Sequence, residues 1–113
     1  MTFAVICIDR PDTAELRDRT RLAHLEYINP YRAKMKIGGA LLDEAGERRV
    51  GMVFAIDFPT REAVEAFMRD EPYTKAGIFE SVMIRRIHVV YPEADPSYFD
   101  DLLANERQAA GKG

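Results

Sequence analysis

Two short segments, far apart in the chain, combine side chains that can move protons. The first, residues 21–25, carries His24 in a stretch with helical character. The second, residues 70–77, opens with two adjacent carboxylates, Asp70 and Glu71. An imidazole paired with a carboxylate is suited to general acid–base catalysis near neutral pH. We therefore predict a catalytic site in which His24 exchanges the proton and Glu71 or Asp70 orients its ring.

Two further side chains lie close to these groups in sequence. Arg21 precedes His24 by about one helical turn, so the two are expected side by side on the helix. The guanidinium of Arg21 is suited to binding an anionic or enolate oxygen of a substrate. Tyr73 is placed to donate a hydrogen bond to the same ligand. Simpler interpretations stay open: a solvated arginine, a tyrosine that anchors a turn, and a histidine bonded only at a helix edge.

The other candidates for chemistry are weaker. His88 lies near a strand end and is expected to be exposed, and Cys7 lies in an apolar run as a small buried hydrophobe. The histidines are far apart and the carboxylates are scattered, which matches no metal-ligand spacing. The glycine pair at residues 38–39 lacks the flanking lysine of a phosphate-binding loop. We expect neither a metal nor a cofactor.

Hydrophobic periodicity and turn residues predict the elements that position these side chains. Strands are predicted at residues 3–8, 37–42, 50–58 and 79–91, with helices from about 13 to 27 or 29 and from 59 to 70. The βαββαβ order is that of a single ferredoxin-like α+β domain with an antiparallel sheet.

The first predicted helix carries the candidate histidine. Asp12 and Glu15 resemble a capping box at its start. At about 100° per residue, the side of the helix that faces the core is predicted to consist of Leu16, Thr20, Ala23 and Tyr27. His24 is predicted to lie at the edge of this side. Residues 31–36 are ambiguous, and a broken continuation of the helix is one interpretation.

The pattern of the strands also predicts how the protein assembles. In a fold of this kind both helices cover one face of the sheet, and the other face should be polar where water covers it. Here both faces are apolar. In the first strand one face carries residues 3, 5 and 7 and the other carries 4, 6 and 8, and in the third strand residues 52, 54, 56 and 58 oppose 51, 53 and 55. Such an exposed face is rare in a monomer. We therefore predict a homodimer packed sheet to sheet, with the C-terminal extension as the alternative cover.

The chain is predicted to divide into a domain at residues 1–92 and an extension at residues 93–113. In the extension, Ser97 and Asp100 predict the cap of a short helix. A helix of that length needs to dock, either on the dimer interface or over the site, and a frayed tail is the alternative. Disorder is predicted for residues 108–113.

Composition limits the partners of the protein. The 113 residues suffice for one domain with a core, and the formal net charge is −3. Because the basic residues are scattered among acidic ones, nucleic acid is not an expected partner. No apolar stretch is long enough to span a bilayer, and the N-terminus lacks an export signal. We therefore expect a cytoplasmic protein with no membrane association.

Four motifs in order resemble the YciI-like proteins, the family of the YCII-related domain, over roughly residues 3–90. They are Arg21-x-x-His24-Leu25, Gly38-Gly39-Ala40-Leu41, the strand from Gly51 to Phe58, and Glu71-Pro72-Tyr73-x-x-Ala76-Gly77-x-Phe79. The resemblance implies a ferredoxin-like domain that dimerises through its sheets into a dimeric α+β barrel. It also implies an active site built around a His–Asp pair. Most members have no established reaction, and one relative removes chloride from a chlorinated hydroxyhydroquinone.

Two departures from the family pattern bear on these expectations. The usual Asp-Pro-Tyr is here Glu71 followed by Pro72 and Tyr73, so the acid is one methylene longer and Asp70 competes as the partner of the histidine. Ala40 replaces the proline of the family's Gly-Gly-Pro-Leu, which affects mainly the rigidity of the backbone.

Together these features predict a small-molecule enzyme with lyase, isomerase or dehydrohalogenase-like chemistry on an anionic or phenolic compound. Two alternatives stay open. The first is a non-catalytic dimer that binds a metabolite in the same cavity. The second is a dimeric α+β barrel oxygenase or isomerase of aromatic compounds, which would have a wide apolar cavity with His24 turned away from it.

Overall fold

Four antiparallel strands form one sheet in the computed structural model, which describes residues 1–111. Along the sheet the order is β2-β3-β1-β4. The strands are β1 (Thr2–Asp9), β2 (Met35–Leu42), β3 (Arg49–Asp57) and β4 (Phe79–Arg86). With α1 (Ala14–Ile28) after β1 and α2 (Arg61–Asp70) after β3, the element order is βαββαβ. The predicted ferredoxin-like α+β fold is confirmed.

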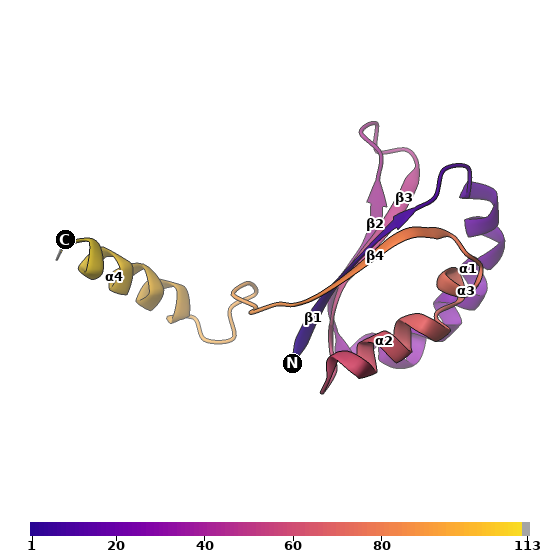
Figure 1. Cartoon of the computed structure of the whole chain (residues 1–113). Coiled ribbons are helices and arrows are strands. Elements are labelled where there is room, and N and C mark those ends of the chain that lie inside the picture. Colours follow the sequence, from indigo (N-terminus) through magenta and orange to yellow (C-terminus); the bar gives the residue numbers. More distant parts are fainter. Residues whose placement is uncertain (112–113) are drawn as a thin grey trace.

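The helices α1, α2 and the short α3 (Pro72–Lys75) all lie on one face of the sheet, as Figure 1 shows. The core fills the space between these two layers. Its sheet side chains come from alternate positions, as a strand's period of two requires. The buried apolar side chains there include Phe3, Val5, Cys7, Met52, Phe54 and Ile56 of the sheet, and Val64, Phe67 and Met68 of α2. The face predicted to carry residues 3, 5 and 7 is therefore the covered one.

The second helix begins at Arg61, two residues after its predicted start, and ends at Asp70 as predicted. The hydroxyl oxygen of Thr60 accepts a hydrogen bond from the backbone N–H of Ala63 at 3.1 Å, which satisfies one of the free donors at the helix start. The helix stops at Asp70, two residues before Pro72, because proline disfavours helical geometry in the residue that precedes it.

The first helix differs from its prediction in two respects. Asp12 has a positive φ of 63°, and Thr13 takes the N-cap position without a side-chain cap, so the predicted capping box is wrong. The hydroxyl of Thr13 instead donates to the carbonyl oxygen of Arg10 at 2.8 Å. Ala23, predicted to point inward, is exposed, whereas His24 is partly buried and Arg17 is the buried residue of the helix.

Between α1 and β2 the chain forms the 3₁₀ helix η1 (Asn29–Lys34), which resolves the ambiguous segment at residues 31–36. Tyr31 of this helix packs edge-on against Phe67 of α2, with ring centroids 4.8 Å apart. The 3₁₀ turn therefore anchors the entry to β2 on the core.

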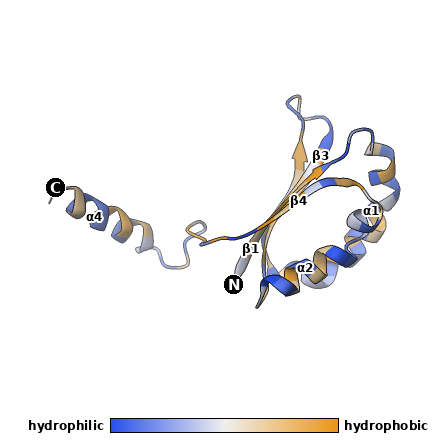
Figure 2. Cartoon of the chain, viewed as in Figure 1, coloured by the Kyte–Doolittle hydropathy of each residue, from blue (hydrophilic) through white to orange (hydrophobic). Residues whose placement is uncertain are grey.

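The opposite face of the sheet is apolar where the alternation predicts it. By strand pairing, Ile37 lies opposite Ala55 and Met83 lies opposite Ile6, so these side chains share that face. Ile37 is 66% exposed and Met83 is also exposed. In Figure 2 the strands show predominantly hydrophobic colours, and no helix of the described chain covers this face. The homodimer predicted from it stays a prediction.

The C-terminal part departs most from its prediction. β4 ends at Arg86 rather than at residue 91, and α4 (Tyr98–Gly111) extends away from the sheet, as Figure 1 shows. The extension therefore covers neither the sheet face nor the helical layer in this structure. As predicted, a helix begins directly after Ser97, whose carbonyl oxygen accepts a hydrogen bond from the N–H of Asp101 at 3.0 Å, while its hydroxyl donates to Asp95 at 2.9 Å. Residues 108–111, predicted to be disordered, are helical, and residues 112–113 of that prediction lie outside the described residues.

Over residues 1–111, none of the helices combines the length and the apolar character that crossing a membrane requires.

Candidate active site

The structure brings together the imidazole and one of the two candidate carboxylates. His24 Nδ1 of α1 lies 2.5 Å from Oε1 of Glu71, which directly follows α2. The Glu71 side chain is 0% exposed and that of His24 is 12% exposed, so the contact is almost wholly shielded from water. Asp70, the other candidate, is exposed as the last residue of α2. Glu71 is therefore the acid that contacts the ring.

The local backbone explains why Glu71 rather than Asp70 points inward. Glu71 is extended, with φ −65° and ψ 130°, and it is the N-cap of α3. Its second oxygen, Oε2, accepts a hydrogen bond from the backbone N–H of Thr74 at 3.1 Å. Both carboxylate oxygens are thus engaged, one by the helix start and one by His24. A side chain held at both oxygens keeps a fixed orientation toward its partner.

Tyr73 stacks on the ring of His24. The ring centroids are 4.0 Å apart and the planes differ by 10°, and Tyr73 is only 1% exposed. Burial raises the pKa of the Tyr73 phenol, which nearby arginines only partly oppose, so the group stays neutral near pH 7. Stacking locks the plane of the imidazole. This contact matches the simpler interpretation of Tyr73 as an anchor, and the predicted hydrogen bond to a ligand stays a prediction.

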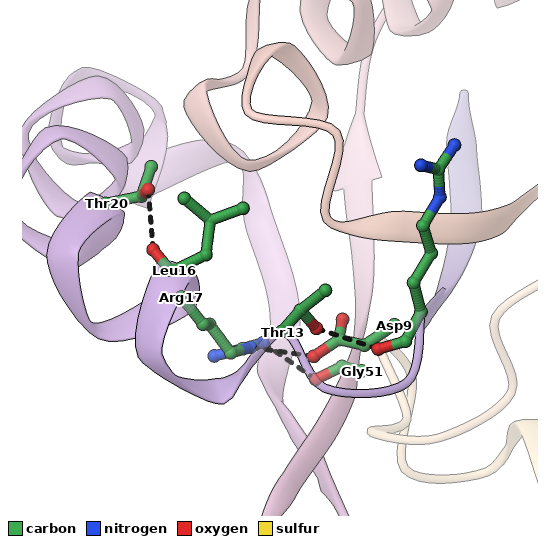
Figure 3. A network of polar contacts seen from close by, with 7 residues as sticks. Asp9, Thr13, Leu16, Arg17, Thr20 and Gly51 are labelled. Atoms are coloured by element: carbon green, nitrogen blue, oxygen red, sulfur yellow. Dashed lines mark hydrogen bonds and ion pairs between the residues drawn. The ribbon is translucent and has the colours of Figure 1, made fainter.

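Arg17 holds the site in place through contacts with two strands and with Tyr73. Its role was not predicted from the sequence. Its Nε donates to Asp9 Oδ2 at 3.1 Å and its Nη2 donates to the carbonyl oxygen of Gly51 at 2.9 Å, as Figure 3 shows. The guanidinium carbon also lies 4.7 Å from the ring centroid of Tyr73. Burial raises the pKa of the Asp9 carboxyl, and the charge of Arg17 opposes that shift. Arg17 therefore ties α1 to two strands and to the stacked rings.

The spacing of Arg17 carried a signal that was available. Residues 17, 21 and 24 follow one another at helical intervals, so they lie on one side of α1. A helical arginine is usually exposed to solvent, so this spacing alone does not predict burial. A guanidinium can be buried only where it has hydrogen-bond partners, and here the sheet provides them.

A cavity of about 510 Å³ lies between α1 and the strands β2 and β3. His24 and Arg21 both line it from α1, and their roles in catalysis and ligand binding stay predictions. The other lining residues are Arg17, Leu25, Ile28, Arg32, Met35, Gly38, Gly39, Ala40, Arg49, Met52, Phe54 and Tyr73. The site thus joins the two motifs to the glycine pair of β2.

The cavity wall carries a concentration of positive charge that the sequence reasoning did not foresee. Four arginines line it, namely Arg17, Arg21, Arg32 and Arg49, and none of its lining residues is acidic. Arg32 comes from η1, which directly continues α1, whereas Arg49 comes from the start of β3 and is brought to the site by the pairing of β3 with β2. Only Arg21 was predicted.

This arrangement can perform acid–base chemistry on an anionic molecule. Because Glu71 occupies Nδ1 of His24, Nε2 is the ring nitrogen left to exchange a proton with a ligand. A carboxylate at Nδ1 fixes the tautomer and the orientation of the ring. Arginines around the cavity stabilise negative charge that is present or that develops during reaction.

Cys7 is outside this chemistry. Burial, together with the nearby charges of Glu71 and Asp9, raises the pKa of its thiol to about 12. The thiol therefore stays protonated and acts as a small core side chain, as predicted. Among residues 1–111, no three His, Cys, Asp or Glu side chains cluster in a way that could hold a metal ion.

Among solved structures, the chain is similar to 5-chloro-2-hydroxyhydroquinone dehydrochlorinase from Burkholderia phenoliruptrix AC1100, in complex with 2,5-dihydroxybenzoquinone. The identity is 28% and the TM-score 0.75, over 78% of this chain and 94% of that one. A putative antibiotic biosynthesis monooxygenase from Bacteriodes thetaiotaomicron shares the fold, with 10% identity and a TM-score of 0.50 over 84% of this chain and 93% of that one.

A second antibiotic biosynthesis monooxygenase likewise shares the fold, with 12% identity and a TM-score of 0.50 over 79% of this chain and 97% of that one. No protein of curated function matches the sequence significantly. The sequence profile of the YCII-related domain matches residues 1–88. The chain therefore belongs to the YCII-related domain family.

Proposed function

We propose that this protein is an enzyme in which His24 acts as a general acid–base, oriented by Glu71, on a small anionic or phenolic compound. The observation that carries the proposal is the 2.5 Å contact between His24 Nδ1 and the buried Glu71 carboxylate at the wall of a cavity. A buried acid–imidazole pair beside a ligand-sized cavity is a recurrent arrangement for proton transfer.

The reaction type that fits best is a proton transfer or an elimination. In an elimination, Nε2 of His24 takes a proton from the substrate, and the electrons of the broken bond form a new double bond. The leaving group then departs as an anion, and the imidazolium later returns the proton to water. Arg21 stabilises the oxyanion that develops on a phenolic or enolic substrate. The step needs no oxidant or reductant.

Similarity to a dehydrochlorinase supports this reaction class. That protein is 28% identical over most of its length and forms a complex with a dihydroxybenzoquinone, a planar oxygenated ring. A cavity of about 510 Å³ accepts a ring of that size, since small-molecule sites are commonly about 300 to 1,000 Å³. The alternative oxygenase interpretation required His24 to turn away from an apolar cavity, whereas His24 and four arginines line this one.

We also propose that the protein functions as a homodimer packed through the open face of its sheet. The exposed apolar side chains of that face, such as Ile37 and Met83, support this assembly. Size-exclusion chromatography with light scattering tests it directly. Substitution of Ile37 with Lys should convert the dimer to a monomer, because a charge buried in an apolar interface is strongly unfavourable.

The catalytic role is tested with 5-chloro-2-hydroxyhydroquinone and a panel of related chlorinated hydroquinones, with chloride release as the readout. The unmodified protein should release chloride from at least one compound. His24→Ala should reduce kcat/KM by about 10²- to 10⁴-fold without loss of folding, because positioned acid–base groups contribute about that factor. Unchanged turnover in His24→Ala would refute the assignment. Binding of 2,5-dihydroxybenzoquinone without turnover of any compound would favour the non-catalytic alternative.

A further inference from the structure

The cavity lining is positively charged although the chain as a whole is negatively charged. The whole protein has a formal net charge of −3, yet the residues that line the cavity include four arginines and no carboxylate. Positive side chains gathered around a concave surface focus the electrostatic potential and attract anions. The ligand therefore has to supply negative charge.

The arginines are not equivalent. Arg17 is buried and paired with Asp9, so its charge is already largely balanced. Arg21, Arg32 and Arg49 are exposed at the cavity wall, and within residues 1–111 none of them forms an ion pair. These three guanidinium groups, which we call the free arginines, keep all their donors available to a ligand.

Apart from the arginines, His24 and Tyr73, the cavity lining is apolar. Met35, Met52 and Phe54 come from the two strands, and Leu25 and Ile28 come from α1. Gly38 pairs with Phe54 across the strands and adds no side chain. A Cβ placed on Gly38 would meet the Phe54 Cβ at 3.5 Å, an ordinary contact, so the glycine leaves room rather than relieving a clash. An unobstructed apolar wall suits the face of a planar ring.

The structure favours a carboxylate over a phosphate as the anionic group. Phosphate sites usually use free backbone N–H groups at a helix start or a glycine-rich turn. Here α1 contributes residues 17–28, which exclude its first turn, and residues 38–40 belong to a paired strand. Guanidinium side chains are thus the main donors. Because their planar fork fits carboxylate and phosphate alike, it is the absence of the α1 start and of a glycine-rich turn from the described cavity lining that favours the carboxylate.

We infer that the cavity selects a planar, mostly apolar organic acid whose carboxylate binds the free arginines while its ring lies along β2 and β3, beside His24. This inference rests on the proposed function in taking the cavity as the reaction site. It adds a preference within that substrate class, for an aromatic or conjugated acid over a neutral phenol.

The test compares two compounds that differ only in the carboxylate. Isothermal titration calorimetry with 2,5-dihydroxybenzoate and with hydroquinone, at low ionic strength, should show at least about tenfold tighter binding of the acid, since charge-assisted hydrogen bonds contribute at least that much. Added salt should reduce this preference. Equal affinity for the two compounds would overturn the inference. Tighter binding of phenyl phosphate than of benzoate would also overturn it, in favour of a phosphate site.

Charge-matched variants locate the binding group. Arg21→Gln, Arg32→Gln and Arg49→Gln each remove one positive charge at the cavity, and Arg19→Gln removes one from the same helix at an exposed position outside it. At least one of the three cavity variants should lose most of the preference for the acid, and Arg19→Gln should keep it. Retention of the preference in all three would contradict the inference.

The outcome is separable from that of the proposed function. His24→Asn should keep the preference for the acid while it loses turnover, because the free arginines rather than the imidazole recognise the carboxylate. If the unmodified protein prefers the acid but converts no compound, the substrate class stands and the catalytic proposal fails. If it converts neutral phenols and shows no preference for the acid, the reverse holds.

Discussion

The two histidines of this chain occupy opposite kinds of surroundings. His24 is almost enclosed, contacts a fully buried carboxylate that is 47 positions away in the chain, and stacks on a buried tyrosine. His88 is exposed beyond the end of β4, and its Nε2 lies 2.8 Å from the hydroxyl of Tyr98, only 10 positions away. One histidine is fixed by the tertiary structure and the other by a local contact with the extension.

This contrast shows what distinguishes a candidate catalytic histidine from an incidental one. Both rings have a hydrogen-bond partner, so the presence of a partner does not separate them. Shielding does, because a charged or tautomeric preference is imposed strongly only where water is excluded. A partner held by two independent contacts also fixes the ring, as Glu71 does through the start of α3.

The same substitution made at each of the two histidines should give the largest difference in kcat/KM. His24→Asn should lower kcat/KM by about 10²- to 10⁴-fold, because the proton-transfer group is lost. His88→Asn should leave kcat/KM unchanged, because its ring is not among the residues that line the cavity. The same chloride-release assay measures both variants. Comparable losses in the two would remove the distinction drawn here.

Removing the hydrogen-bond partner of each histidine should change the free energy of unfolding by different amounts. Glu71→Ala should lower the free energy of unfolding by about 3 kcal/mol, because a shielded ring loses its partner and α3 loses its cap. Tyr98→Phe should cause no measurable change, because its contact is exposed. Urea denaturation followed by circular dichroism measures both.

Glu71→Gln is the matched control for this pair of variants. The amide keeps the size of the side chain and an oxygen for the Thr74 N–H, so it should be less destabilising than Glu71→Ala. Its effect on turnover should nevertheless remain large, because the amide no longer stabilises the imidazolium. A stability loss in Glu71→Ala no greater than in Tyr98→Phe would show that shielding does not matter here.

Only a small effect is expected from substitution of Asp70, the neighbour of the buried acid. Asp70→Asn should change kcat/KM by less than about twofold, since substitutions at exposed positions are usually close to neutral. The same steady-state assay measures it beside Glu71→Gln. A large loss in Asp70→Asn would show that the exposed acid acts on the site after all.

Much of the fold could be predicted because it depends on short-range patterns. Alternating apolar residues define the strands, Thr60 marks the start of α2, and Pro72 forces its end. The same patterns placed His24 and Arg21 on one side of a helix and a carboxylate after the next helix. Periodicity predicted most of the inward side of α1 but missed Arg17, because that side chain is buried through Asp9 and Gly51, which lie on two different strands.

The amino-acid sequence by itself determined the order of the elements and the residue types that can do chemistry, since helical and strand periods and turn residues act over a few positions. Only the tertiary structure decided between Asp70 and Glu71, because adjacent side chains point in different directions where a helix ends. Only the tertiary structure brought Arg49 to the cavity beside Arg21 and Arg32, because the pairing of β2 with β3 joins segments whose proximity no local pattern encodes.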